Sequence, residues 1–394
     1  MKSDFNLNQI RDDTIGCKTV IHLNNAGAAL MPKPVANAIR DYITKEENSG
    51  GYETADAERN ELNKFYDFGA DILNCQTKNI AYTTSATDSY NRALSSIHFK
   101  QGEIVLISGN DYPSNFMAFL ALQKRFGIKL IRVKNAGTGE MDLEDLENKL
   151  KQFSPRVVSV SHIPTSSGLV QPAEEIGNII KNYDALYLLD ACQSLGQMKV
   201  DAQTMHADFI SGTFRKFLRG PRGAGVLYIS DKALDAGMEP LSIDSRGAEW
   251  IAENEYKSKP DAKRFENWET AYALMSGSKE ALAYLLSIGI ENIEARNNEL
   301  VSKLKKGLTN IDNIELLDRG KKQCSIITFS VQNKSEEGTK KYFSDKGINI
   351  YTTRKISAMI DFEEKGVEWV VRVSPHYYNS EDEIDTFIEA VKKL

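Results

Sequence analysis

Short apolar runs alternate with amphipathic stretches through the middle of the chain. The apolar runs have the length of buried strands and end on polar residues. They predict strands at 79–83, 103–107, 129–133, 156–160, 185–189 and 208–212. The intervening stretches predict helices at 87–98, 114–126, 142–152 and 172–182. This alternation is typical of a mainly parallel sheet with helices on both faces.

The pattern changes after Ser230. Residues 244–261 are rich in polar residues and glycine and predict a long irregular loop. Two helices are predicted beyond it, at 271–287 and 292–308, and strand-like runs at 325–331 and 369–373 then alternate with helix-like runs at 337–346 and 380–393. Ser380 and Glu383 have the spacing of a capping box that opens the last helix. The end of the chain therefore predicts a smaller α+β unit.

A chain of 394 residues is long enough for two domains. We expect a large α/β domain over 21–265 and a small α+β domain built from 1–20 and 266–394. The net charge of −6 and the lack of a dense basic cluster argue against a nucleic-acid partner.

Two further features bear on location and metal binding. The most apolar stretch, 281–290, is too short for a membrane span, and the polar start over 1–8 has no secretory signal. The four cysteines lack CxxC spacing, which predicts no zinc or redox pair. We expect a reduced cytoplasmic protein with no metal site and no membrane partner.

Candidate chemistry gathers between residues 185 and 225. Asp190 ends one predicted strand, Gln193 follows it, and Thr213 ends the next strand. Ligands of parallel sheets bind just beyond the carboxyl ends of the strands. We therefore expect these three side chains to lie together at one edge of the sheet.

Lys216 follows the second of these strands by a few residues. Arg215, Arg219 and Arg222 are close to it in sequence, and like charges disfavour the ammonium form. The pKa of Lys216 should therefore fall, which makes its amine a better nucleophile. A carboxylate, an amide, a hydroxyl and such a lysine are the groups needed to hold pyridoxal phosphate as an imine.

This arrangement resembles the class V aminotransferase family of pyridoxal-phosphate enzymes, which includes cysteine desulfurases, selenocysteine lyases and isopenicillin N epimerase-like proteins. The resemblance covers nearly the whole chain. It implies the PLP-dependent fold type I, with the cofactor between a large and a small domain. It also implies that Lys216 is the imine-forming lysine, that Asp190 pairs with the pyridine nitrogen, and that Gln193 donates to the phenolic oxygen.

The same resemblance implies contacts for the rest of the cofactor. The phosphate is expected on Ala86 and Thr87, at a predicted helix start whose free amides favour an anion. Thr213 and Arg215 match positions that give further phosphate contacts. Tyr112 stands where related desulfurases stack a histidine on the ring, and Thr165 stands where they have an asparagine.

Substrate and partner contacts are implied in the same way. Arg372 lies in an apolar strand, where a charge is costly unless paired, and the resemblance assigns it the substrate α-carboxylate. An internal salt bridge is the alternative for this arginine. Asn25 belongs to the segment that approaches the substrate. Thr270 lies in a segment that in relatives crosses to the neighbouring subunit's phosphate, which implies a homodimer.

The cysteines depart from the desulfurase pattern. Desulfurases pass sulfur to a loop cysteine shortly before the substrate arginine, but residues 351–371 contain no cysteine. A persulfide relay by that route is therefore not expected. The sequence does not decide the roles of His162 and Cys192.

The implied mechanism begins with removal of the α-proton of an amino acid by Lys216, acting as a general base. The resulting carbanion can expel a β-substituent, or be protonated as in an aminotransferase or an epimerase. The motifs look closest to the epimerase-like and cysteine-sulfoxide lyase-like branch, and we predict a carbon–sulfur lyase that eliminates from a cysteine-derived substrate. A PLP-binding protein without turnover is a remote alternative. A nucleotide-binding fold is disfavoured, because neither GxGxxG nor GxxxxGK[ST] occurs.

Overall fold

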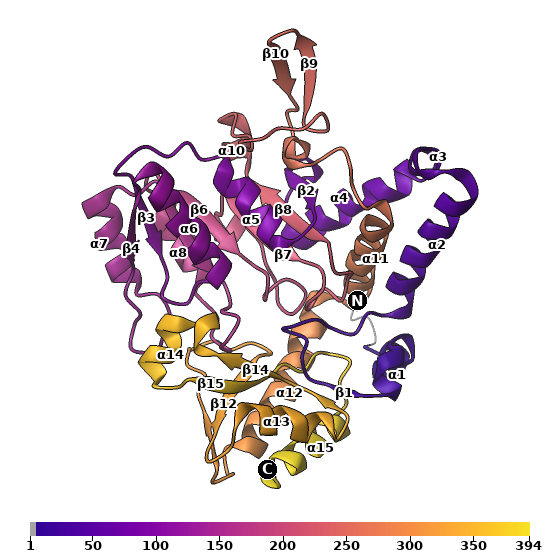
Figure 1. The fold of residues 1–394 in the computed structure, drawn as a ribbon, viewed down its shortest axis with the longest axis vertical. Coiled ribbons are helices and arrows are strands. Elements are labelled where there is room, and N and C mark those ends of the chain that lie inside the picture. The colour runs from indigo at the N-terminus through magenta and orange to yellow at the C-terminus, as the bar shows by residue number, and fades with distance from the viewer. Residues whose placement is uncertain (1–4) are drawn as a thin grey trace.

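The computed structural model describes residues 5–394, so the first four residues of the predicted segment 1–20 lie outside the described part. Figure 1 shows a large α/β body above a smaller α+β body, with the N-terminal segment running between them. The fold prediction is confirmed in both parts. The division at residues 21 and 265 stays a prediction.

The large body is built on a seven-stranded sheet in the order β2-β8-β7-β6-β5-β3-β4. β8 runs antiparallel to both β2 and β7, and the other neighbouring pairs are parallel. The strands are β2 (Ile80–Thr83), β3 (Ile104–Ile107), β4 (Lys129–Arg132), β5 (Val157–Ser161), β6 (Leu186–Asp190), β7 (Phe209–Thr213) and β8 (Gly225–Ile229). The mainly parallel sheet expected from the sequence is therefore present.

Helices cover both faces of this sheet, and β6 shows why. Its alternate residues Leu186 and Leu188 enter one hydrophobic core, while Tyr187 and Leu189 enter another on the opposite face. The first core is closed by α5 (Ala86–Ser95), α6 (Pro113–Phe126) and α10 (Asp231–Asp235). The second is closed by α7 (Leu143–Phe153), α8 (Ala173–Ile180) and α9 (Ala202–Met205). Helices that precede β2 or follow the sheet in the sequence also pack on it.

Those further helices form a layer beside the sheet. α11 (Tyr272–Ile288) packs against α2 (Lys33–Ser49) and α4 (Arg59–Leu73), and α3 (Gly51–Ala57) links the last two. Short helices complete this half of the chain: α1 (Leu7–Asp13), η1 (Ile15–Lys18), η2 (Thr77–Asn79) and η3 (Ala262–Phe265). The amphipathic helices before residue 74 were not predicted from the sequence.

The smaller body contains a four-stranded antiparallel sheet in the order β11-β12-β15-β14. Its strands are β11 (Ile314–Leu316), β12 (Ile327–Val331), β14 (Tyr351–Arg354) and β15 (Trp369–Val373). The helices around it are α12 (Ile290–Leu308), α13 (Glu336–Ser344), η4 (Lys355–Ser357), α14 (Met359–Lys365) and α15 (Glu381–Lys392). The predicted capping box is confirmed: Ser380 Oγ accepts from the Glu383 amide, and Glu383 Oε2 accepts from the Ser380 amide, both at 3.2 Å.

The N-terminal segment joins the two bodies. β1 (Ile21–His22) pairs in parallel with β13 (Ile348–Asn349), and Asn24 forms a parallel bridge with Ser374. A few residues later the Ala29 amide donates to the Arg215 carbonyl at 2.8 Å, beside the turn that carries Lys216. This short segment therefore touches both halves of the molecule.

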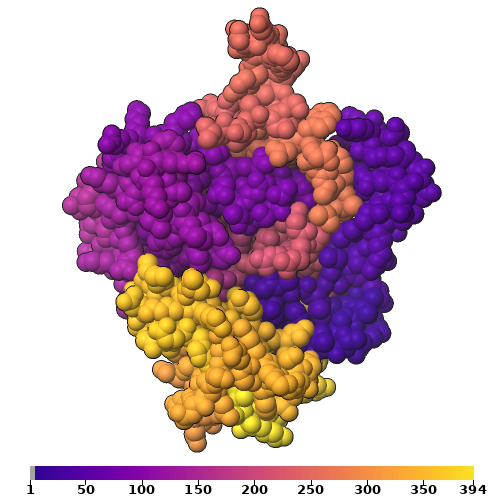
Figure 2. All heavy atoms as spheres, viewed as in Figure 1, coloured from indigo at the N-terminus to yellow at the C-terminus, as the bar shows by residue number. Residues whose placement is uncertain are grey.

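The predicted irregular loop over 244–261 is wrong in its centre. β9 (Ala248–Ala252) and β10 (Glu255–Ser258) form an antiparallel hairpin that projects from the top of the molecule in Figures 1 and 2. Trp250 is 79% exposed there, and Ile251 and Tyr256 are also exposed. The hairpin buries almost no side chain, so it lacks the alternation of apolar and polar residues that marks a half-buried strand.

Within residues 5–394, no helix combines the length and the apolar character needed to cross a lipid bilayer.

Arg219 is a fully buried guanidinium at the junction of the two bodies. It donates to the Leu30 carbonyl at 2.9 Å, to Tyr377 Oη at 2.8 Å and to Thr14 Oγ1. Its Cζ lies 4.4 Å from the ring centroid of Tyr378 and 5.1 Å from that of Tyr377. The charge is therefore stabilised by neutral oxygens and aromatic faces rather than by a carboxylate.

We expect Arg219→Met to lower the free energy of unfolding by about 2–4 kcal/mol, because the buried oxygens Tyr377 Oη and Thr14 Oγ1 lose their donor. Arg219→Lys should lose part of this amount, since an ammonium cannot reproduce the planar fork. Urea denaturation measures the change. Arg59→Met is the control, because Arg59 pairs with Asp56 at the surface, and it should change stability by less than about 0.5 kcal/mol. Equal effects of the two Met variants would contradict this role.

Candidate active site

Polar side chains meet where three strands of the central sheet end. Ser161, Asp190 and Thr213 are the last residues of β5, β6 and β7, and Ser161 is paired in register with Asp190. They open onto a cavity that we call the inner cavity. Its lining residues are Ser85, Ala86, Thr87, Tyr112, Asn115, Ser161, Ile163, Thr165, Asp190, Cys192, Gln193, Thr213, Arg215 and Lys216.

A second cavity, the outer cavity, lies between the inner one and the smaller body. The two share Tyr112, Thr165, Arg215 and Lys216. The remaining lining residues are Asn24, Ala26, Gly27, Ala28, Pro113, Ser114, Met117, Arg222, Tyr351, Thr353, Ile356, Ser357 and Arg372. Large-body, small-body and N-terminal residues therefore surround one continuous space.

The Asp190 carboxylate is buried and held on both oxygens. Oδ2 accepts from Asn115 Nδ2, and Oδ1 accepts from the Cys192 amide, each at 2.9 Å. Asn115 comes from the first turn of α6, and no feature of the sequence pattern singled it out. These two bonds fix the orientation of the carboxylate, which is the only one that lines the inner cavity within residues 5–394.

Lys216 is buried, and its Nζ forms no hydrogen bond or ion pair with another side chain of residues 5–394. The Nζ lies 6.0 Å from the centroid of the Tyr112 ring. Burial is the main cause that lowers the pKa of Lys216 to about 8, and the charges of Arg215 and Arg372 add to it. Cys192 and Asp190 oppose the shift.

This corrects the cause inferred from the sequence, where three neighbouring arginines were expected to lower the pKa. Arg215 contributes to the lower pKa of Lys216. Arg219 instead packs against the rings of Tyr377 and Tyr378, and Arg222 is exposed. Loss of water around the ammonium lowers the pKa of Lys216 more than charge repulsion does. A lysine with this pKa has an appreciable neutral fraction near neutral pH.

Arg372 is a second buried cation on the same space. Nη1 donates to the Thr165 carbonyl at 2.8 Å and to its hydroxyl at 3.2 Å, and Nη2 donates to Asn24 Oδ1 at 3.2 Å. Its Nε has no hydrogen-bond partner in the described part of the chain, and its Cζ lies 4.7 Å from the ring centroid of Tyr351. No acidic side chain within residues 5–394 forms an ion pair with it, so the salt-bridge alternative is wrong. Burial lowers its pKa to about 10.

Gln193 and Thr165 link the two cavities. Gln193 Nε2 donates to the Ala26 carbonyl and to Thr165 Oγ1, both at 3.2 Å. Gln193 Oε1 is buried without a partner. Thr165 therefore touches both the amide that follows β6 and the guanidinium of Arg372. A contact from Gln193 to a bound ring stays a prediction.

Asn25 does not line either cavity. Its side chain is fully buried, where Nδ2 donates to the Ser374 carbonyl at 2.7 Å and Oδ1 accepts from Tyr378 Oη. Asn24, which the sequence analysis did not select, lines the outer cavity and contacts Arg372. The geometry thus favours Asn24 over Asn25 as the residue nearest a ligand.

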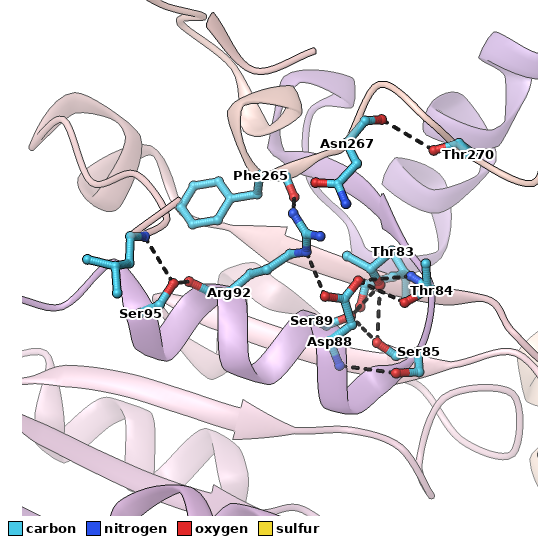
Figure 3. Close-up of polar contacts among 12 residues, drawn as sticks. Thr83, Thr84, Ser85, Asp88, Ser89, Arg92, Ser95, Phe265, Asn267 and Thr270 are labelled. Atoms are coloured by element: carbon cyan, nitrogen blue, oxygen red, sulfur yellow. Dashed lines mark hydrogen bonds and ion pairs between the residues drawn. The ribbon is translucent and has the colours of Figure 1, made fainter. Parts of the chain in front are cut away.

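The start of α5 closes one end of the inner cavity. Ser85 is the N-cap, and its Oγ accepts from the Asp88 amide at 3.1 Å. Ala86 and Thr87 form the first turn and line the cavity, as do Thr213 and Arg215. Figure 3 shows this turn and the segment 265–270 that passes over it. Free amides at a helix start favour an anion.

Thr270 lies on that segment, outside both cavities. Its Oγ1 donates to the Asn267 carbonyl at 3.3 Å, as drawn in Figure 3. Its expected contact with a neighbouring subunit is not tested by a single chain.

The two residues left undecided by the sequence lie in different places. Cys192 lines the inner cavity, and burial, together with Asp190, raises the pKa of its thiol well above the usual range. His162 is buried in the loop after β5, where it lines a different cavity together with Gln171, and burial lowers its pKa to about 4. Across residues 5–394, no group of three or more His, Cys, Asp or Glu side chains could hold a metal ion.

Known proteins are similar to this chain in sequence and fold. The chain is 28% identical over 394 residues to a probable cysteine desulfurase of Pyrococcus abyssi, with 98% of this chain and 96% of that protein covered. The apo cysteine desulfurase of Thermococcus onnurineus NA1 superimposes with a TM-score of 0.90 at 26% identity, covering 98% and 97% of the two chains.

A third relative shows the fold at lower identity. The cystine C–S lyase C-DES matches with a TM-score of 0.87 at 22% identity, over 97% of this chain and 99% of that one, in a complex with its product cysteine persulfide. A variant of C-DES carries glycine covalently linked to its PLP cofactor.

A family model for class-V aminotransferases matches residues 21–387, which include every strand of both large sheets described above. The chain therefore belongs to the class-V aminotransferase family of pyridoxal-phosphate-dependent enzymes.

Proposed function

We propose that the protein is a pyridoxal-phosphate-dependent carbon–sulfur lyase that eliminates the sulfur substituent of a cysteine-derived amino acid. The observation that carries this proposal is Arg372, a buried guanidinium that lines the same cavity as the Lys216 amine and has no carboxylate partner among residues 5–394. An amino acid supplies the missing carboxylate to Arg372 and presents its Cα toward Lys216. The cysteine desulfurases and the cystine lyase among the relatives support the sulfur chemistry.

The inner cavity has groups suited to each part of the cofactor. The unpartnered Lys216 amine suits its aldehyde, and the fixed Asp190 carboxylate suits its ring nitrogen. The first turn of α5, with Thr87, Thr213 and Arg215, suits its phosphate. Tyr112 offers an aromatic face beside Lys216. When bound, pyridoxal phosphate supplies an electron-accepting ring that stabilises negative charge at the substrate Cα.

The chain's own residues then have separate tasks. Arg372 and Asn24 hold the substrate α-carboxylate and so fix the position of Cα. Lys216 Nζ takes the proton from Cα, a task suited to an amine with a pKa near 8. Asp190 offers its carboxylate to the ring nitrogen in a fixed orientation, because Asn115 and the Cys192 amide hold its two oxygens.

The wall of the outer cavity favours direct release of the sulfur product. Between β14 and β15 it offers Ser357 and Ile356, and no cysteine occurs over 351–371. The bond from Cβ to sulfur breaks and its electron pair leaves with sulfur. The remaining fragment is released as 2-aminoacrylate, whose imine tautomer is hydrolysed by one water molecule to pyruvate and ammonia. The homodimer and the cytoplasmic location expected from the sequence stay predictions.

The products decide the reaction class. With cystine or an S-substituted cysteine, and no added keto acid, we expect equimolar pyruvate and ammonia and a sulfur-containing product. Borohydride reduction followed by peptide mass spectrometry should locate the cofactor on Lys216, and Lys216→Ala should lose both this adduct and turnover. Alanine as the carbon product, a requirement for a keto acid, or recovery of inverted substrate alone would reject elimination.

The low pKa of Lys216 predicts an unusual pH profile for its reaction with an aldehyde. The rate of covalent attachment of pyridoxal should rise with pH with a midpoint at about 8 and level above it, because the amine is mostly neutral above that pH. Free Nα-acetyl-lysine, measured in parallel, corrects for the titration of pyridoxal and should rise to about pH 10. Arg215→Met should move the midpoint upward, since one charge that lowers the pKa is removed. A wild-type midpoint near 10 would contradict the assignment.

Arg372→Met tests the carboxylate site. We expect kcat/KM for the amino-acid substrate to fall by about 10²- to 10³-fold, as for loss of one partner of a buried charge pair. The decarboxylated analogue, cystamine in place of cystine, provides the control. Its slow turnover should change little, because it has no group for Arg372 to bind. A proportional loss with both compounds would show that Arg372 acts through the fold instead.

A further inference from the structure

We propose that Asp88 and Arg92 are positioning residues for the anion site at the start of α5. They connect the loop at Thr84 and Ser85 to the backbone carbonyl of Phe265, the last residue of η3, and they keep the first turn of the helix free of net negative charge. The inference rests on the proposed function, because it assumes that this turn binds the cofactor phosphate.

Asp88 occupies an unfavourable position for such a site. It lies in the first turn of α5, directly after Ala86 and Thr87, which both line the inner cavity. Two like charges within several ångströms repel each other, and the repulsion is stronger away from bulk water. An unpaired Asp88 would therefore weaken phosphate binding.

Both oxygens of Asp88 are engaged in the structure. Oδ2 accepts from the Thr84 amide at 3.1 Å and from Thr84 Oγ1 at 3.0 Å, while Oδ1 accepts from Arg92 Nε at 2.8 Å. Figure 3 shows Asp88 between Thr84 and Arg92. The carboxylate thus fixes the loop that precedes the helix, and the guanidinium one turn later neutralises its charge.

Arg92 extends the connection to a distant part of the chain. Its Nη1 donates to the Phe265 carbonyl at 2.9 Å. The side chain of Arg92 is 17% exposed and that of Asp88 is 24% exposed, so water screens this pair less than a surface pair.

The far end of the connection is itself fixed. Phe265 is completely buried, and the next residue, Glu266, accepts from the Tyr82 amide at 2.9 Å and from Tyr66 Oη at 2.8 Å. Tyr82 lies in β2, the strand that leads into the α5 loop. Arg92 therefore links Asp88 to residues 265–266, whose own position is fixed by Tyr66 and Tyr82.

Comparing pyridoxal phosphate with pyridoxal, which lacks the phosphate, isolates this role. For Arg92→Met we expect the dissociation constant of pyridoxal phosphate to rise about tenfold and that of pyridoxal to stay unchanged. Asp88→Asn combined with Arg92→Met should recover most of the loss, because the unpaired charge is gone and the asparagine oxygen still accepts from Thr84. Equilibrium dialysis measures both ligands without relying on turnover.

Lys149→Met is the matched control. Lys149 pairs with Asp145 at the same spacing and with similar exposure, in α7, and Asp145 also accepts a backbone amide from a preceding loop. This control should leave the affinity for both ligands unchanged. Arg92→Lys, which keeps the charge but not the fork, covers the case in which Arg92→Met does not fold, and it should give a smaller loss confined to pyridoxal phosphate.

Two results would overturn the inference. One is an Arg92→Met variant that binds pyridoxal phosphate as tightly as the wild type. The other is an equal loss for pyridoxal, which indicates general damage to the cavity. A wild-type protein that binds neither ligand would reject the proposed function as well, so the two failures can be told apart.

Discussion

The structure depends on positive charge buried without a matching acid. Lys216, Arg215 and Arg372 all line the outer cavity, and within residues 5–394 Asp190 is the only carboxylate among the residues that line the two cavities. Burying cations is costly unless partners compensate, and here neutral oxygens do so only in part. The unmet need for negative charge explains why this space suits a ligand with a phosphate and a carboxylate. The same buried cations therefore make the fold less stable and favour binding of an anionic ligand.

This charge arrangement exists only because three separate stretches of chain meet. Lys216 comes from the turn after β7, Arg372 from β15, and Asn24 from the N-terminal segment. Arg219 fastens the same junction three residues after Lys216, through oxygens and aromatic rings instead of acids. The molecule therefore uses cations both to build the junction and to create the site within it.

Much of this was visible in the sequence, for identifiable physical reasons. Asp190 ends a strand whose residues are all buried, and Arg372 is a charge inside an apolar run, so both stand out from their neighbours. Asn24 and Asn25 have no such contrast, since identical residues one position apart differ only in what the fold places beside them. Asn115 was missed because its value comes from a tertiary contact with Asp190. The hairpin at 248–258 was missed because its residues bury too little to leave a periodic pattern.

The parallel pairing of β1 with β13 has a consequence for biosynthesis. Residues 21–22 leave the ribosome early, but their partners at 348–349 are made more than three hundred residues later. Contacts between such distant segments form late, because a long loop must close first. Until then the backbone groups of β1 have no strand partner, and unpaired strand edges are prone to aggregation. The active site, which also needs Arg372 from β15, is therefore completed only when nearly the whole chain has been made.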